Sequence, residues 1–276
     1  MRVRVLTLNV QHDQGDPRRT TLINQELRRN QPDVVVLQEV CYPDRSDQLA
    51  DLLDGTGLHG THQATVLDHL PPGADVYGGT AIATRWPHRI LAAIDNRDGP
   101  PGDPYWWTLA AGVDLPDLGE VLVITPTTAW ELDAEAARER QMVELAALAA
   151  QHRTELPTIV AGDLNADPAS ASVRFLTGLQ SLDGRSVHLH DAWAVAGSGP
   201  GYTWTSANPL AAAEIERLIG QPGVHRRIDY VFAGSVHPHS RGSARVLAAR
   251  LVGDRPVDGV WLSDHAGVLA DLDLRR

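Results

Sequence analysis

Short apolar runs that end at a polar residue recur along the whole chain. They are rich in Val, Ile and Leu and too short for typical helices, so each run predicts a β-strand. The run at 34–37 is apolar at every position, which is typical of a strand buried on both faces. The predicted strands cover residues 3–9, 33–39, 80–84, 107–113, 120–125, 158–163, 228–232, 245–251 and 267–272.

Helical periodicity is present in fewer segments. The longest predicted helix spans residues 134–152, with Asp133 placed to cap its first turn and Met142, Leu145 and Leu148 on one apolar face. Shorter helices are predicted at 21–30, 46–54 and 169–176. Segments rich in Pro and Gly at 71–79, 99–104 and 197–201 are typical of surface loops. None of these loops is long enough to link two domains, so we predict one domain of the α/β (α+β) class over residues 1–276.

The basic residues exclude several classes of enzyme, because all 24 of them are Arg and the chain has no Lys. P-loop NTPases, protein kinases and Schiff-base enzymes all need an amine side chain. The net charge of −11 argues against a general nucleic-acid-binding protein. The single cysteine, Cys41, excludes an intrachain disulfide. No apolar stretch approaches the ~20 residues of a membrane-spanning helix, and a strand begins the chain where a signal peptide would lie, so we expect a cytoplasmic location.

The residues at the ends of the predicted strands carry the candidate chemistry. Asn9, Glu39 and Asp163 end three of the apolar runs, and Asp264 and His265 precede the last one. Carboxylate, amide and imidazole groups suit a hard divalent cation with oxygen ligands and a water molecule activated by a base. Each residue taken alone also fits ordinary turn or capping chemistry.

Five segments occur in a recognisable order, at 7–10 (TLNV), 37–40 (LQEV), 162–168 (GDLNADP), 227–231 (RIDYV) and 262–265 (LSDH). Together they resemble the endonuclease/exonuclease/phosphatase superfamily, which includes pancreatic-type deoxyribonucleases, apurinic endonucleases, inositol polyphosphate 5-phosphatases and neutral sphingomyelinases. The resemblance implies a four-layered sandwich of two packed mixed β-sheets flanked by helices. It also implies hydrolysis of a phosphomonoester or phosphodiester by direct attack of water, with Mg²⁺ as the cofactor and Mn²⁺ as the alternative.

The resemblance assigns a metal site to three residues. Glu39 is the principal metal ligand, and Asn9 and Asp264 complete the site directly or through water. A turn residue at the end of a strand is the alternative explanation for Asn9.

The resemblance assigns catalytic roles to four further residues. Asp163 orients or deprotonates the attacking water, and Asn165 beside it binds a phosphate oxygen. His265 contacts the phosphate and takes part in acid–base chemistry, while Asp229 hydrogen-bonds the imidazole and fixes its tautomer.

One position departs from the family pattern. The family normally carries a further His after a central strand, and here that position falls on Thr127, or on Pro126 or Thr128 if the alignment shifts by one residue, so the His is absent in each case. A threonine hydroxyl donates a neutral hydrogen bond, which is roughly half as strong as a charge-assisted one. The enzyme is then slower, or another group such as His12, His188 or an Arg replaces the imidazole, or the substrate differs.

Aromatic residues near the predicted loops are candidates for substrate contact. Tyr105, Trp130 and Trp204, together with Thr127, form the predicted substrate-binding set, and packing beneath the loops is the alternative for the three aromatics. The match of residues 55–60 to G-x-G-x-x-G follows a helix instead of a strand, so it does not predict a dinucleotide site.

Three functional hypotheses follow. A hydrolase of a compact phosphorylated substrate is favoured by the acidic charge and the absence of Lys. A DNA or RNA nuclease of the same fold is the alternative, and a non-catalytic member that lacks the family His is the third. No obligate protein partner is evident from the sequence.

Overall fold

Two mixed sheets make up the body of the computed structural model, which describes residues 1–43, 47–67, 78–95, 107–238 and 242–276. The first sheet runs in the order β13 (Ser243–Val252), β14 (Gly267–Arg275), β1 (Arg2–Asn9), β2 (Val34–Val40), β4 (Gly79–Thr84) and β3 (His59–His62). The second runs in the order β5 (His88–Asp95), β6 (Trp107–Leu115), β7 (Gly119–Thr127), β8 (Ile159–Asp163), β12 (Asp229–Gly234) and β9 (Leu189–Asp191).

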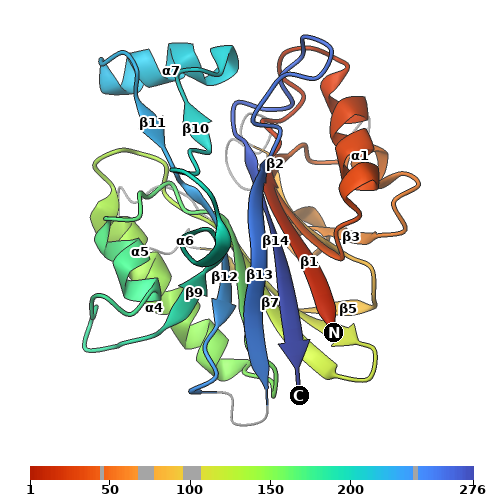
Figure 1. The fold of residues 1–276 in the computed structure, drawn as a ribbon, viewed down its shortest axis with the longest axis vertical. Helices are drawn as coiled ribbons and strands as arrows, with labels where there is room; N and C mark the ends of the chain where they lie inside the picture. The colour runs from red at the N-terminus through yellow and green to blue at the C-terminus, as the bar shows by residue number, and fades with distance from the viewer. Residues whose placement is uncertain (44–46, 68–77, 96–106, 239–241) are drawn as a thin grey trace.

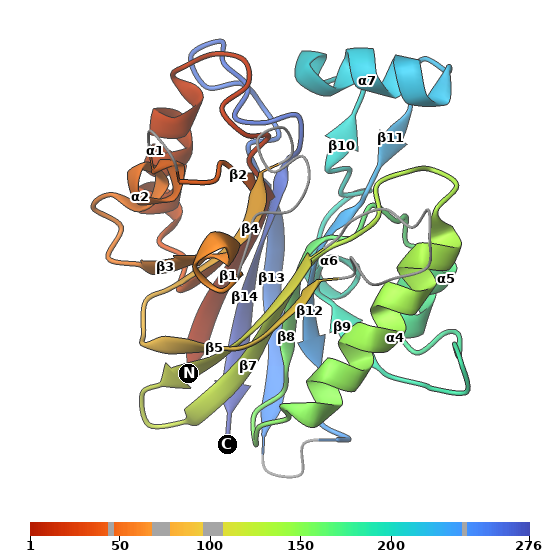
Figure 2. The same ribbon diagram turned by 180° about the vertical axis from the view of Figure 1, so that it is seen from behind.

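Helices cover the outer face of each sheet (Figures 1 and 2). The first sheet carries α1 (Arg19–Asn30) and α2 (Gln48–Leu53), and the second carries α4 (Glu135–Gln151) and α5 (Ala171–Leu176). This arrangement confirms the predicted four-layered sandwich. The shorter elements are η1 (Gln63–Thr65), α6 (Ala192–Ala196), β10 (Trp204–Thr205), α7 (Pro209–Ile219) and β11 (His225–Arg226).

The two-residue period of the strands explains why four layers form. In β1, Val3 and Val5 face the second sheet, while Leu6 and Leu8 pack under the helices. Residues 34 and 36 of β2 face inward in the same way, and residues 35 and 37 face outward. Because both faces of these strands are buried, the runs are apolar throughout instead of alternating.

Each sheet contains a parallel pair joined by a helix. β1 pairs with β2 and β7 pairs with β8, and the connections carry α1 and α4. The carboxyl ends of these four strands therefore lie at the same end of the sandwich. The α7 helix and strands β10 and β11 extend from the body at that end, opposite the chain termini (Figure 1).

All nine predicted strands and all four predicted helices are present, with shifted ends. The prediction that Asp133 caps the long helix was wrong, because α4 begins at Glu135 with Ala134 as its N-cap and no side-chain cap. Strand β7 continues through Pro126 to Thr127, since Pro126 still lies in register with Thr108 of β6.

Several elements were not predicted. The strand β3 is polar throughout and β9 is three residues long, so neither has an apolar run to detect. The helix α7 did carry a signal, because Asn208 caps it, Pro209 begins it and Gly220 ends it with a left-handed backbone. The predicted loop at 197–201 is confirmed, whereas the one at 99–104 and most of 71–79 lie outside the described residues. In the part of the chain that the structure describes, no helix combines the length and the apolar character needed to cross a membrane.

The contact between β7 and α4 gives a stability prediction. Leu122 is fully buried in the core between the second sheet and its helices. We expect Leu122→Ala to lower the free energy of unfolding by about 2–5 kcal/mol, because the cavity cannot close completely. Urea denaturation measures this, with the exposed Leu179→Ala as the control, which should change it by less than about 0.5 kcal/mol. Equal effects of the two variants would contradict the described core.

Candidate active site

The face between the two sheets is apolar at one end of the sandwich and polar at the other. Along β1 the inward residues are Val3, Val5, Thr7 and Asn9, and their polarity increases toward the end of the strand. The same change occurs along β8, where Ile159 and Ala161 are followed by Asp163. Strand β12 is antiparallel to β8, so its first residue, Asp229, lies directly opposite Asp163. Regular strand pairing thus brings the predicted residues of both sheets to one place.

A buried triad lies at the centre of this polar end. His265 Nδ1 is 2.9 Å from Asp229 Oδ2 and 4.0 Å from Asp163 Oδ2. Ligand atoms of all three residues lie within 4.8 Å of one another, and all three side chains are buried. Since Asp229 occupies Nδ1, the Nε2 atom of His265 is the nitrogen left to face a ligand.

The position of Asp163 depends on a close approach between β7 and β8. A Cβ atom on the neighbouring Gly162 would lie 2.3 Å from the Pro126 carbonyl oxygen. Only glycine fits there, which explains the Gly-Asp pair in the sequence motif.

Burial and like charges perturb the pKa values of the triad. Burial raises the pKa of Asp163 to about 6, and the charge of Asp229 adds to this effect. Burial alone would lower the pKa of His265, but the charges of Asp229, Asp264 and Asp163 outweigh it and raise that pKa well above its ordinary value. The imidazole is therefore protonated at neutral pH.

Asn9 connects the two sheets at this site. Its Nδ2 atom donates to Glu39 Oε1 at 2.9 Å and to Asp163 Oδ2 at 3.3 Å. Its Oδ1 atom accepts the backbone N–H of Gln11. The amide nitrogen, which cannot bind a cation, is thus the atom that faces both carboxylates.

A bulge in β2 directs Glu39 into the site. The register between β2 and β4 shifts between Leu37 and Val40, and Glu39 has φ of 57°, in the left-handed region. Such a backbone is unfavourable for a residue other than glycine and is found preferentially at functional sites. Burial raises the pKa of Glu39 to about 8, with a further contribution from the charge of Asp264.

The loop before β14 holds Asp264 in place. The Ser263 hydroxyl donates to Asp264 Oδ1 at 3.0 Å, and the Asp264 N–H donates to Gln11 Oε1 at 3.2 Å. Asn208, the cap of α7, donates to the carbonyl oxygens of Ser263 and Asp264. The helix α7 therefore supports the segment that carries both Asp264 and His265.

Arg19 has a structural role at the site that was not predicted from the sequence. Its guanidinium is 3% exposed and donates to the carbonyl oxygens of Val10, Gln14 and Leu262. Those carbonyls belong to the loop after Asn9 and to the segment before Asp264. A planar fork with several donors can tie two loops together in this way.

The predicted substrate-binding residues occupy different environments. The hydroxyls of Thr127 and Thr80 are 2.7 Å apart across the two sheets, and Thr127 lies level with Asp163. Trp130 is 41% exposed in the loop after β7. Trp204 is 5% exposed and packs against Ala211, Ile215 and Ile228 under α7, which favours the packing alternative. Tyr105 lies outside the described residues.

Asn165 follows Asp163 with a left-handed backbone, at φ of 47°. Its N–H donates to Asp163 Oδ1 at 3.0 Å, and its side-chain amide donates to the Thr128 carbonyl oxygen at 3.3 Å. This turn holds the amide beside the carboxylate of Asp163.

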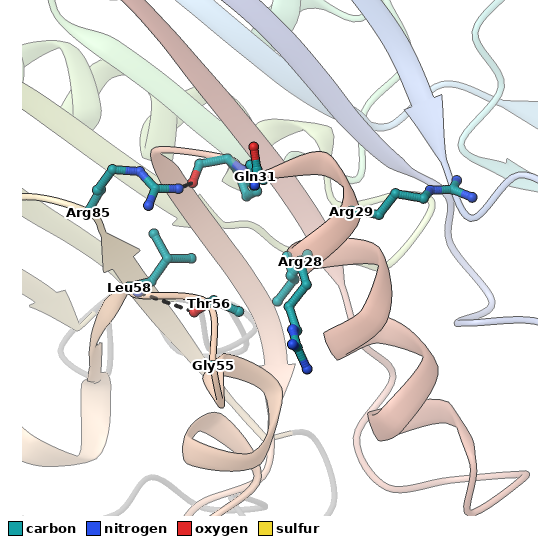
Figure 3. Close-up of a pocket in the computed structure, with 9 residues that line it drawn as sticks. Arg28, Arg29, Gln31, Gly55, Thr56, Leu58 and Arg85 are labelled. Atoms are coloured by element: carbon teal, nitrogen blue, oxygen red, sulfur yellow. Dashed lines mark hydrogen bonds between the residues drawn. The ribbon is translucent and has the colours of Figure 1, made fainter.

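A pocket lies at the C-terminal end of α1, whereas Arg19 is at the N-terminal end of that helix (Figure 3). The residues that line the pocket do not include any of the predicted site residues. It is lined by residues of α1, by Arg85 and by Gly55, Thr56 and Leu58 of the G-x-G-x-x-G match. The segment runs from α2 into β3, so the strand–helix context of a dinucleotide site is absent here. Arg85 donates from Nε to the carboxylate of Asp33 and from Nη2 to the Pro32 carbonyl oxygen.

The sequence matches the model of the Endonuclease/Exonuclease/phosphatase family over residues 6–265. The chain belongs to this family. Family members include metal-dependent phosphodiesterases and nucleases, and they hydrolyse phosphoester bonds. No match was found among curated protein sequences.

Solved structures of family members share the fold at low sequence identity. D. rerio TDP2 complexed with a single-strand DNA product aligns with a TM-score of 0.70 at 19% identity, covering 99% of each chain. The protein from Bacteroides vulgatus gives 0.70 at 20% identity over 100% of both chains. The human Nocturnin catalytic domain with bound sulfate gives 0.68 at 19% identity, over 99% of this chain and 93% of that one.

The contacts of Arg19 predict a large difference between two adjacent arginines. Arg19→Leu leaves buried carbonyl oxygens without donors and should lower the free energy of unfolding by about 1–3 kcal/mol. Arg18→Leu is the matched control, because Arg18 is exposed and its side chain pairs with the nearby Asp16, so its loss should cost less than about 0.5 kcal/mol. Hydrogen exchange at residues 263–265 should accelerate only in Arg19→Leu. Unchanged exchange there would contradict the proposed link between the loops.

Proposed function

We propose that this protein is a divalent-metal-dependent phosphoester hydrolase that acts on a compact phosphorylated substrate. The observation that carries the proposal is the concentration of four carboxylates around the imidazole of His265: Asp163, Asp229 and Asp264 are buried, and Glu39 is half-buried. Water activation and phosphate binding both require such a set of groups in one place.

The donor set at Glu39 fits a divalent cation. The raised pKa of Glu39 means that its carboxylate repels its neighbours and lacks solvation. A cation held by the oxygen atoms of Glu39 and Asp264 would remove that penalty, and Mg²⁺ prefers oxygen ligands. Asn9 would complete the site through its carbonyl oxygen or by orienting Glu39. When bound, the metal would neutralise charge on the phosphate and polarise its P–O bonds.

Asp163 and His265 are suited to move protons. A carboxylate whose pKa is raised to about 6 accepts a proton from water more readily than an ordinary aspartate does. The imidazolium of His265, held through Nδ1 by Asp229, would donate from Nε2 to a phosphate oxygen. Asn165 would donate a second, neutral hydrogen bond from the same side.

The proposal includes a substrate that differs from those of other family members, because Thr127 replaces a histidine of the family. Thr127 stands at the position of the family His, and its hydroxyl already pairs with Thr80. His265 would then supply the nearest charged donor. The net charge of −11 and the absence of Lys also argue against a long polyanion, because only Arg side chains are left to bind its phosphates.

A nuclease of the same fold is the second candidate. The structural similarity to D. rerio TDP2, crystallised with a single-strand DNA product, favours it, as does the exposed Trp130, which can stack on a base. Nocturnin with bound sulfate is a similar structure that holds a compact anion.

The first test is loss of activity on removal of the metal or of its ligand. Hydrolysis of bis-p-nitrophenyl phosphate and of sugar phosphates should need Mg²⁺ or Mn²⁺ and stop in EDTA. Asp163→Asn should reduce kcat by about 10²–10⁴-fold, as expected for loss of a general base. Glu39→Gln should abolish the metal response, whereas Glu120→Gln, at the opposite end of β7, should not. Activity in EDTA that survives Glu39→Gln would refute the proposal. No turnover on any phosphoester would favour the non-catalytic alternative.

The second test uses pH. Glu39 has a pKa of about 8 in the folded protein against an ordinary value of 4.5, so the folded state binds this proton more tightly. Without metal, the free energy of unfolding should therefore fall as pH rises from 4.5 through 8, and Glu39→Gln should flatten that fall. Asp163 acts in the same direction up to about pH 6, and the stabilisation from His265 is lost only as pH rises through its raised pKa.

Mg²⁺ competes with this proton, so its affinity should increase by about tenfold per pH unit up to pH 8. Calorimetric titrations at pH 6, 7 and 8 measure this, and an affinity independent of pH would contradict the role of Glu39.

The third test separates the two substrate classes. Nicking of supercoiled plasmid should be weak at moderate salt while small phosphoesters are hydrolysed. Strong Mg²⁺-dependent nicking that disappears in Asp163→Asn would favour the nuclease and overturn the preference for a compact substrate.

A further inference from the structure

We infer that the chain carries a second cation site, at His12, Asp13 and Cys41, for a thiophilic divalent ion such as Zn²⁺. One ligand atom from each residue lies within 4.8 Å of the other two. The site is built from residues outside the catalytic cluster, and it does not depend on the proposed function.

An unpaired buried nitrogen is the independent sign of a ligand. His12 is 6% exposed, and its Nε2 atom is buried without a hydrogen-bond partner among the described residues. Buried polar atoms are nearly always paired, so the unpaired nitrogen of this imidazole, one of whose ring nitrogens lies within 4.8 Å of ligand atoms of Cys41 and Asp13, calls for a missing partner. A metal ion or its bound water supplies one.

The backbone of two of these residues is clamped by one side chain. Gln48 of α2 donates from Nε2 to the His12 carbonyl oxygen at 2.8 Å and accepts the Cys41 N–H on Oε1 at 2.7 Å. Gln48 is itself buried. The His12 N–H also donates to the Glu39 carbonyl oxygen, at 3.0 Å. The backbones of His12 and Cys41 are therefore held before any ion arrives, which reduces the cost of ordering these two ligands, whereas Asp13 is exposed.

The ligands His12, Asp13 and Cys41 favour a softer metal ion than the oxygen ligands of the catalytic site do. Sulfur and imidazole favour Zn²⁺ and related transition metals, whereas Mg²⁺ prefers oxygen alone. Three protein ligands leave a fourth tetrahedral position for water. On binding, Cys41 would release its proton to solvent, and the sulfur would bond to the metal as a thiolate.

Co²⁺ provides a direct probe, because a thiolate–Co²⁺ bond gives a charge-transfer band in the near ultraviolet. Cys41 is the only cysteine, so such a band can arise from no other residue. We expect one equivalent of Co²⁺ to produce the band and Zn²⁺ to displace it. The band should vanish in Cys41→Ser and in His12→Ala, and persist in Glu39→Gln and in the control His59→Ala.

The two hydrogen bonds of Gln48 to the backbones of His12 and Cys41 give a second, quantitative test. Gln48→Ala should weaken Zn²⁺ binding about 10–100-fold, as loss of a residue that orients metal ligands typically does. Competition with a chromophoric chelator measures this, and circular dichroism confirms that each variant is folded. The absence of a charge-transfer band in the unmodified protein, or a band that survives His12→Ala, would overturn the inference, whether or not the protein hydrolyses phosphoesters.

Discussion

Repulsion between closely placed carboxylates, most of them buried, is the constraint around which this end of the molecule is organised. Glu39, Asp163 and Asp264 lie close enough to change one another's ionisation or that of His265. The nearby guanidinium of Arg19 donates to carbonyl oxygens and forms no hydrogen bond with these carboxylates among the described contacts. The imidazole of His265, whose pKa these charges raise, offsets part of the negative charge, and the cation that we propose would offset more of it. A site arranged in this way stores free energy that binding of a metal would release.

The fold tolerates this arrangement because it confines the charge to one end of a large apolar interface. Val3 and Val5 belong to the same inward row as Asn9, and Ile159 and Ala161 to the same row as Asp163. The apolar end holds the two sheets together, so the polar end does not need to stabilise the fold. The bulge at Glu39 and the turn at Asn165 are further departures from regular structure at this end, and the same apolar interface supports them.

Much of the fold and of the candidate site was predictable from the sequence, because strands bury alternate residues and end in polar ones. Asn9, Glu39 and Asp163 could be placed from the ends of apolar runs alone. The pairing of Asp229 with His265 was implied only by the family resemblance, since it depends on the register between β8 and β12. The role of Arg19 could not be predicted, because its partners are backbone carbonyl oxygens, which every residue has, so no pattern of side chains in the sequence indicates them. The sequence left two explanations open for Trp204, because an aromatic residue near a loop is equally suited to packing and to binding.

Anomalous scattering from Mn²⁺ in crystals of the protein tests the central claim most directly. The account predicts a strong peak within bonding distance of carboxylate oxygens of Glu39 and Asp264, with Asp163 and His265 beside it and not in the coordination shell. A crystal soaked in Mn²⁺ with no peak at Glu39, or with Mn²⁺ bound by Asp163, Asp229 and His265 instead, would contradict it.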